Sequence, residues 1–259
     1  MKIKTRISKK NILTTTVQVT VAALASTVML GVGNVQANTN ILIDDFGQAQ
    51  KVNSDPNDLP PIKSQVGPYN NILGSYRDIF IDDVTTNDSS NSSSFVVSNG
   101  AAFFSNDFGV QGTGIMVWDG DDDPDTVNFQ GLGGINIIEN GLDHIAMELS
   151  SDLDGLNVKF NIYDMNGKIS SIDREFSAMP TTSNQDFLFD DFVGNAEFDN
   201  VGAIELLLKG PQRIDAGIDL IEIARTNPPK PIPEPTSILG LLVIGATGAG
   251  SILKRKHNR

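Results

Sequence analysis

The chain contains no cysteine, and this absence excludes several kinds of site. It rules out disulfides, thiol nucleophiles and zinc sites built on thiolates. Only two histidines occur, and one of them, His257, stands close to the C-terminus. Catalysis by a cysteine–histidine pair is therefore excluded, and the sequence has no Gly-x-Ser-x-Gly motif to support a serine triad on the other, His144.

Tryptophan and tyrosine are also scarce, with one and three residues in a chain of 259. A deep polysaccharide cleft uses several such rings as stacking platforms, so the composition weighs against one. Hydrolysis of a glycoside by two carboxylates requires them to face each other across the sugar, about 5–10 Å apart. Sequence spacing does not establish that geometry. We therefore predict a protein without catalytic residues and keep a carboxylate-dependent glycoside hydrolase as the least favoured alternative.

Acidic residues are absent from the first 37 positions, where three features follow one another. A basic start with five Lys or Arg residues precedes the apolar stretch Val17–Val32, and small residues then lead to Ala37. This order predicts a secretory signal peptide over residues 1–37, cleaved after Ala37 and exported by the Sec machinery. A retained N-terminal membrane anchor is the alternative, although Thr20, Ser26 and Thr27 dilute the apolar stretch.

The other end of the chain carries a second apolar segment, residues 236–253, which has no charged side chain. As a helix these 18 residues reach about 27 Å, close to the thickness of the hydrocarbon core of a bilayer. Basic residues follow at once, and such a cluster holds its end on the cytoplasmic side. They are Lys254, Arg255, Lys256 and Arg259.

The triplet Pro233, Glu234 and Pro235 stands directly before this apolar segment. The order of triplet, apolar span and basic tail resembles the PEP-CTERM sorting signal of cyanobacteria and other Gram-negative bacteria. The resemblance implies an exosortase-type membrane protease as partner, which cuts near the triplet. It also implies transient anchoring in the inner membrane and delivery to the cell surface or extracellular matrix. A plain C-terminal transmembrane anchor is the alternative.

These two ends leave a middle section that is poor in positive charge. Residues 38–235 contain ten Lys or Arg residues and all 32 acidic ones, so ten minus 32 gives a formal charge of −22. Such a body repels nucleic acid and anionic lipid and attracts divalent cations. We predict an acidic domain over residues 38–225, a proline-rich linker over 226–235, and the transmembrane helix with its basic tail over 236–259.

Short apolar stretches separated by turn residues run through this domain. Asp143–Leu149 alternates strictly, which places Ile145, Met147 and Leu149 on one face and His144 on the polar face. Asn99-Gly100 and Asn166-Gly167 are hairpin turns by composition. About ten strands and no long helical pattern predict an all-β fold, an antiparallel β-sandwich.

Further stretches narrow this fold. Residues 198–206 followed by 218–221 resemble the closing strands of jelly-roll domains of the galactose-binding and carbohydrate-binding kind. Residues 78–82 and 97–100 fit the same layout. The resemblance implies a jelly-roll-like sandwich, and it does not identify a ligand.

One loop concentrates carboxylates between apolar strands, at Asp119, Asp121, Asp123 and Asp125. Alternate carboxylates on one loop are the ligands that Ca²⁺ prefers, so we predict a candidate calcium site there. It is not an EF-hand, because Pro124 stands where that loop needs glycine. A solvated acidic turn is the other interpretation of this loop, and the sequence favours it over the calcium site. Trp118, directly before the loop, is either a sugar-stacking ring beside the ion or a core residue at a strand end.

The resemblance to jelly rolls implies a second cation site, because their first and last strands often meet near a structural calcium. Asp44 or Asp45 with Asp219 are its candidates here. Taken together, these patterns predict an exported, exosortase-sorted, non-catalytic surface or matrix protein with a structural or adhesive role, for which calcium is a candidate stabilising ion. A glycan-binding module for matrix polysaccharide is the alternative.

Overall fold

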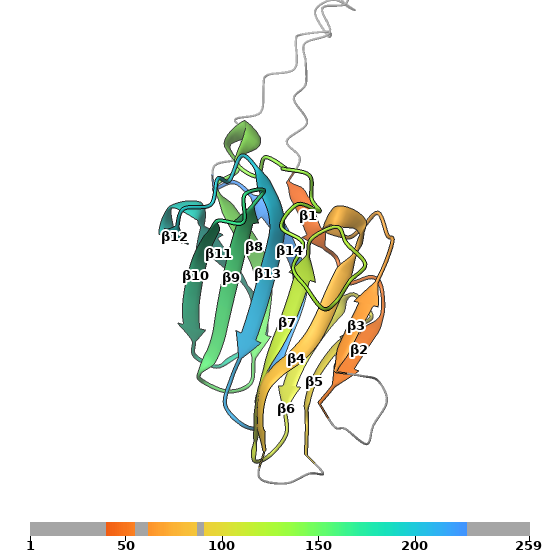
Figure 1. Ribbon diagram of the computed structural model, residues 1–259. Coiled ribbons are helices and arrows are strands. Elements are labelled where there is room, and N and C mark those ends of the chain that lie inside the picture. Colours follow the sequence, from red (N-terminus) through yellow and green to blue (C-terminus); the bar gives the residue numbers. More distant parts are fainter. Residues whose placement is uncertain (1–39, 55–61, 87–90, 227–259) are drawn as a thin grey trace, which may run out of the picture. The chain divides into compact units, whose positions relative to one another are not determined.

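The computed structural model describes residues 40–54, 62–86 and 91–226, which form an all-β body (Figure 1). Every strand pairing in it is antiparallel, and two sheets share one hydrophobic core. The predicted antiparallel β-sandwich is confirmed. Within these ranges no helix is long and apolar enough to cross a bilayer. The predicted signal peptide and C-terminal span lie outside the described residues.

Sheet A takes strands from both ends of the described chain, in the order β11-β8-β14-β6-β5-β2, with β1 also paired to β14. Its strands are β1 (Ile41–Asp44), β2 (Gln50–Asn53), β5 (Ser93–Ser98), β6 (Ala101–Asn106), β8 (His144–Ser151), β11 (Met179–Leu188) and β14 (Asp215–Ala224). The first and last strands meet, as in the jelly rolls that the sequence resembles.

Sheet B has the order β12-β10-β9-β13-β7-β4-β3. Its strands are β3 (Lys63–Val66), β4 (Arg77–Thr86), β7 (Val110–Trp118), β9 (Leu156–Asp164), β10 (Ile169–Phe176), β12 (Val193–Gly194) and β13 (Val201–Lys209). Three single turns of 3₁₀ helix complete the elements, at Leu73–Ser75, Glu139–Gly141 and Phe189–Asp191.

Alternation along the strands decides which side chains enter the core. Ile145, Met147 and Leu149 are buried, as the pattern predicted. Asn99 and Gly100 both have positive φ and join β5 to β6, as a two-residue type I′ turn requires. The Asn166-Gly167 hairpin is also present, closed by the hydrogen bond from the Asp164 N–H to the Lys168 carbonyl at 3.0 Å.

The two sheets interlock through aromatic rings. Phe160 of β9 and Phe187 of β11 meet edge to face, with ring centroids 4.9 Å apart. A β-carbon at Gly114 of β7 would lie 2.6 Å from Phe104 and 3.0 Å from Phe95 of sheet A. Glycine at this position therefore lets sheet B approach the two rings closely.

Two apolar stretches of the sequence do not form complete strands. The stretch Phe187–Phe192 ends β11 at Leu188 and then turns through 3₁₀ helix. The aromatic rings of this turn pack on one another, with Phe189 and Phe198 centroids 5.1 Å apart, and this packing overrides strand propensity. Ile135 contributes a single bridge to Val201, so the stretch around it is no strand.

A buried ion pair crosses the core between the sheets. Arg77 of β4 and Asp44 of β1 are both fully buried, with Nη1 lying 3.0 Å from Oδ1 and 2.9 Å from Oδ2. Trp118 of β7 donates its Nε1–H to Asp44 Oδ2 at 2.9 Å, and Gln50 of β2 accepts from Arg77 Nε at 2.8 Å. Burial raises the pKa of Asp44, while Arg77, Trp118 and the Phe46 N–H counteract that rise.

Removing one partner of this pair leaves the other charge buried without compensation. We expect Arg77→Met in the full-length protein to lower the free energy of unfolding by about 3–5 kcal/mol. The matched control is Lys63→Met, which removes an exposed ion pair with Asp125 and should cost less than about 1 kcal/mol. Urea denaturation of both variants measures the difference. Equal losses would show that the buried pair does not support the fold.

Candidate functional site

The outer face of sheet A carries two neighbouring rows of side chains that differ in polarity. Cross-strand partners lie on the same face of a sheet, so the pairings place Val96, Phe103, Gly217 and Ser150 in one row across β5, β6, β14 and β8. The four strands span about 14 Å. This apolar row is the first half of the candidate site.

The second row runs beside it, two residues away from the first row on each strand. Ser94, Ser105 and Asp215 are paired across β5, β6 and β14, and Asp152 follows at the end of β8. The Ser105 hydroxyl donates to Asp215 Oδ1, and the Asp215 N–H donates to Asp152 Oδ1 at 2.7 Å. This polar row offers hydroxyls and carboxylates at one margin of the apolar one.

Together the two rows line an open groove of about 460 Å³, with Pro180 of β11 at its end. The Phe103 ring is 47% exposed inside it. A β-carbon at Gly217 would lie 2.9 Å from Ser150 Oγ and 3.6 Å from the Phe103 ring. Glycine thus keeps the floor low beside the ring, and we call this feature the Phe103 groove.

The groove combines an accessible aromatic face with hydrogen-bonding groups along one side. A sugar has the matching two-sided chemistry, because its C–H faces are apolar and its rim carries hydroxyls. The two carboxylates of the groove come from adjacent backbone positions, since the Asp152 N–H donates to the Asp215 carbonyl at 3.1 Å. Both carboxylates therefore stand on the same side of the groove. Glycoside hydrolysis requires two carboxylates that face each other across the sugar, and this pair does not.

Sequence reasoning missed Phe103, although a signal was present. Two adjacent aromatic residues in a strand point to opposite faces, so either Phe103 or Phe104 had to lie outside. Phe104 is fully buried against Phe95, and Phe103 is therefore the outer ring.

The sugar-stacking interpretation of Trp118 is wrong. Its ring is 0% exposed and its N–H is bound to Asp44, so no face of it is open to a ligand. Trp118 is a core residue at the end of β7, which was the other interpretation. The reason is register: Asp78 pairs with Val117, which places Trp118 beside Arg77 on the inner side of sheet B.

The acidic loop begins immediately after this tryptophan, and its first two carboxylates accept hydrogen bonds from the loop itself. Asp119 is 1% exposed and accepts the N–H groups of Asp121 at 3.1 Å and Asn128 at 2.7 Å. Asp121 Oδ2 accepts the Asn128 side-chain amide at 2.9 Å. Burial raises the pKa of Asp119, and the two N–H groups oppose that rise.

The other two carboxylates of the predicted calcium site point elsewhere. Asp123 Oδ1 accepts the Asp125 N–H at 3.0 Å, and Asp125 itself pairs with Lys63 at 2.6 Å. Over the described residues, no three acidic or histidine side chains are grouped as a metal would require. The structure thus places the four carboxylates on one loop without converging them, and calcium binding by this loop stays a prediction.

The second predicted cation site is not assembled either. Asp44 is inside the core with Arg77, and Asp45 accepts the Asn71 side-chain amide at 2.5 Å. Asp219 is exposed and accepts the Thr182 hydroxyl at 3.3 Å. The strands that carry these residues do pair, but a bulge and the inward turn of Asp44 separate the carboxylates.

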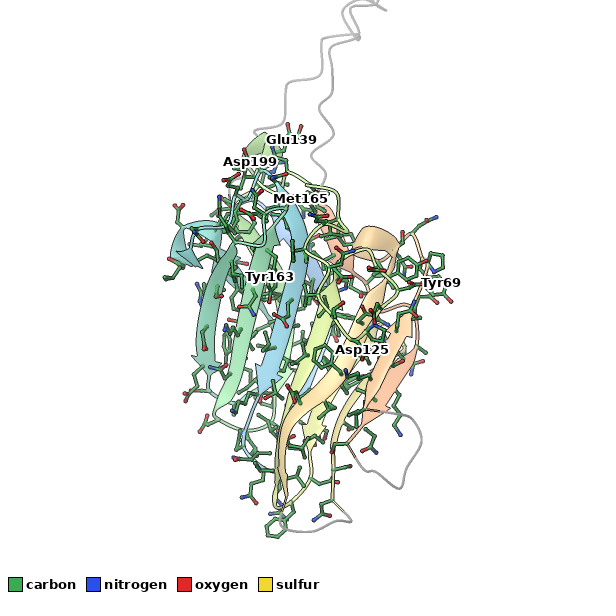
Figure 2. The ribbon with its side chains drawn as sticks, in the orientation of Figure 1. Tyr69, Asp125, Glu139, Tyr163, Met165 and Asp199 are labelled. Carbon is green, nitrogen blue, oxygen red and sulfur yellow. The ribbon has the colours of Figure 1, made fainter. Side chains whose placement is uncertain are left out.

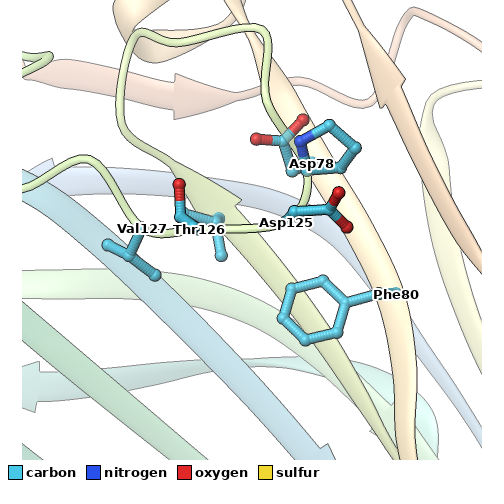
Figure 3. Close-up of a pocket in the computed structure, with 7 residues that line it drawn as sticks. Asp78, Phe80, Asp125, Thr126 and Val127 are labelled. Atoms are coloured by element: carbon cyan, nitrogen blue, oxygen red, sulfur yellow. The ribbon is translucent and has the colours of Figure 1, made fainter.

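Sequence reasoning also missed Asp78, which lies beside the acidic loop (Figure 3). It follows Arg77 on β4 and therefore points to the outer face of sheet B. Loop residues cover it, so the residue is only 2% exposed. Burial raises the pKa of Asp78 to about 7, and the charges of Asp119, Asp121, Asp123 and Asp122 add to this rise.

His144 was predicted to lie on the polar surface, and this prediction was wrong. The residue is 5% exposed because β11 and β14 pair with β8 on its two sides. Its Nδ1 lies 2.6 Å from Asp143 Oδ1 and its Nε2 lies 3.6 Å from Asp186 Oδ1. Burial acts to raise the pKa of Asp143, but the hydrogen bonds with His144 and Thr226 outweigh it and lower that pKa.

The predicted sorting motif, Pro233-Glu234-Pro235, lies outside the described residues.

Comparison with known proteins gives likeness in fold only. No protein-family profile matches the chain, and no curated protein matches its sequence. Among solved structures, the family 11 carbohydrate-binding module of cellulase Lic26A-Cel5E of Clostridium thermocellum is similar, at 10% identity and a TM-score of 0.37. The match covers 73% of this chain and 96% of that module.

Two further structures show a similar level of likeness. TmCBM61 in complex with beta-1,4-galactotriose matches at 12% identity and a TM-score of 0.30, over 70% of this chain and 90% of that one. An exo-beta-agarase matches at 11% identity and a TM-score of 0.35, over 74% of this chain and 25% of the enzyme. The Phe103 groove is defined by the geometry of this chain alone.

The raised pKa of Asp78 predicts how stability depends on pH. The folded state binds this proton more tightly than the unfolded chain, whose value is near 3.8, so stability falls as pH rises from about 4 to about 7. Asp78→Asn should remove this decrease in the free energy of unfolding. Each unit of pKa shift of Asp78 corresponds to a decrease on the order of 1.4 kcal/mol. Urea denaturation of wild type and variant at several pH values measures it. Parallel pH profiles would contradict the prediction.

Proposed function

We propose that this protein is a non-catalytic glycan-binding module that holds its ligand in the Phe103 groove. The observation that carries the proposal is the pairing of an exposed aromatic ring with a row of hydroxyls and carboxylates on one sheet face. The ring offers a stacking surface for the C–H face of a sugar, and Ser94, Ser105 and Asp215 offer partners for its hydroxyls.

The glycan-binding interpretation is the alternative from the sequence, and the structure favours it over a purely structural role. The half-exposed Phe103 beside the recessed Gly217 gives a sugar ring a stacking face with room above the sheet. A hydrolase is less well supported, because the groove carboxylates stand on one side and accept hydrogen bonds from the protein.

Truncating the ring tests this function directly. Phe103→Ala in the full-length protein should weaken binding of its polysaccharide at least about tenfold, since the stacking surface is lost. Phe108→Ala is the matched control, because that ring is 65% exposed at the turn after β6 and lies outside the groove. Affinity electrophoresis against soluble β-glucans, galactans and mannans identifies the ligand and compares the variants. Binding that survives Phe103→Ala unchanged would overturn the proposal.

We further propose that the module is displayed outside the cell by the two terminal signals. The support is the sequence: the signal peptide over residues 1–37, and the triplet Pro233-Glu234-Pro235 before an apolar span and a basic tail. On this proposal Sec exports the chain, an exosortase-type protease processes it, and the acidic domain reaches the cell surface or matrix. There the domain would hold polysaccharide and contribute to adhesion.

Intact-mass analysis of protein recovered from its native host tests the display. We expect a mass that begins near Asn38 and ends near Pro235, because both signals are removed. A variant with alanine at all three triplet positions should keep its C-terminal residues. A wild-type mass that still includes Arg259 would contradict sorting and leave a domain tethered to the membrane.

A further inference from the structure

A second pocket lies on the opposite side of the sandwich, on the outer face of sheet B (Figure 3). Its volume is about 60 Å³, and the acidic loop forms its roof above β4 and β7. Asp78 lines it and is 98% buried, yet its Oδ1 has no hydrogen-bond partner among the described residues. A buried carboxylate oxygen without a donor is costly, so this atom is suited to a ligand that donates a hydrogen bond.

Among the described residues, the charged side chains around the pocket are acidic, with one exception. The loop carboxylates Asp119, Asp121, Asp122 and Asp123 all act on Asp78 through their charge. The exception is Lys63 of β3, whose ammonium lies 2.6 Å from Asp125 at the pocket margin. Lys63 therefore pairs with Asp125 at the margin and leaves the carboxylate of Asp78 inside the pocket available to a cation of the ligand.

The pocket walls indicate what kind of cation fits. Phe80, Val117, Pro124 and Val127 supply apolar contacts around Asp78. A bare metal ion needs several oxygen ligands, and the described part of the chain groups no three carboxylates for one. An organic ammonium needs one or two acceptors for its N–H donors and gains from apolar walls around its carbon atoms.

We propose that this pocket binds a primary ammonium group carried by a sugar, as in a de-N-acetylated hexosamine. The ammonium donates to Asp78 Oδ1, and the attached carbon lies against Phe80 and Val127. The choice of a sugar as the carrier rests on the proposed glycan-binding function. The amine recognition itself rests on the pocket and is independent of the Phe103 groove.

A row of side chains leads from the pocket across the outer face of sheet B. Asp78, Val117, Glu205, Asn161 and Ser171 are cross-strand partners in one row on the outer face of sheet B. Glu205 lies two strands from Asp78, about 10 Å away. It accepts the Asn161 amide at 2.6 Å and the Tyr163 hydroxyl at 2.8 Å. Figure 2 shows Tyr163 and Asp125 on this same face.

Calorimetry with matched trisaccharides tests the inference. The full-length protein, in a detergent without sugar headgroups, is titrated with the trimer of glucosamine and with the trimer of N-acetylglucosamine. We expect the glucosamine trimer to bind at least about tenfold more tightly, and Asp78→Asn to abolish that preference, since a charged hydrogen bond is lost. Asp122→Asn is the matched control, because it removes the same charge from an exposed position of the loop.

Each other outcome decides against the inference. Equal binding of the two trimers, or an amine preference that Asp78→Asn leaves intact, would overturn it. Methylammonium that binds as tightly as the glucosamine trimer would reject the sugar as carrier, and Asp78-dependent binding of CaCl₂ without binding of the amine would assign the pocket to a metal. Phe103→Ala separates the two proposals: neutral polysaccharide binding that depends on Phe103, with no amine preference, would leave the proposed function standing and reject only this inference.

Discussion

The buried ion pair between Arg77 and Asp44 ties the two sheets together at one end of the sandwich. Its members come from different sheets, and neither charge has access to water. Desolvation of two charges is repaid only when geometry and further hydrogen bonds are good, and here Trp118 and Gln50 complete the shell. The pair therefore tolerates a single relative placement of the sheets at this end of the sandwich.

This placement also determines where the acidic groups meet. Arg77 and Trp118 lie side by side and both point into the core. The direction of the residue that follows each of them is therefore fixed as well. Asp78 must face outward, and Asp119 opens the loop that covers it. A core interaction thus creates an acidic pocket on the outside, although no residue of the pair lines it. The raised pKa of Asp78 is a consequence of that geometry.

The sandwich has two outer faces, and the described strands give them different chemistry. On sheet A the outward positions are small or hydroxylated around one phenylalanine, which produces an open groove suited to a neutral sugar. On sheet B the outward row is acidic and amidic, and a loop closes over one end of it. One core packed from both inner faces leaves both outer faces free to vary, and binding sites on β-sandwiches are such surface features.

Local pattern alone was enough to predict the β-sandwich, its hairpins and most of its strands, because period-two alternation and turn residues act over a few neighbours. The sequence was also enough to identify the cluster of acidic residues and to predict that it forms a loop between strands. The burial of Trp118, the covering of His144 and the exposure of Phe103 beside Gly217 could not be predicted from local pattern. Those outcomes depend on register between strands far apart in the chain, and a shift by one residue would exchange every inward and outward side chain. The register between distant strands therefore determines the binding sites of this protein, whereas the local sequence pattern determines its fold class.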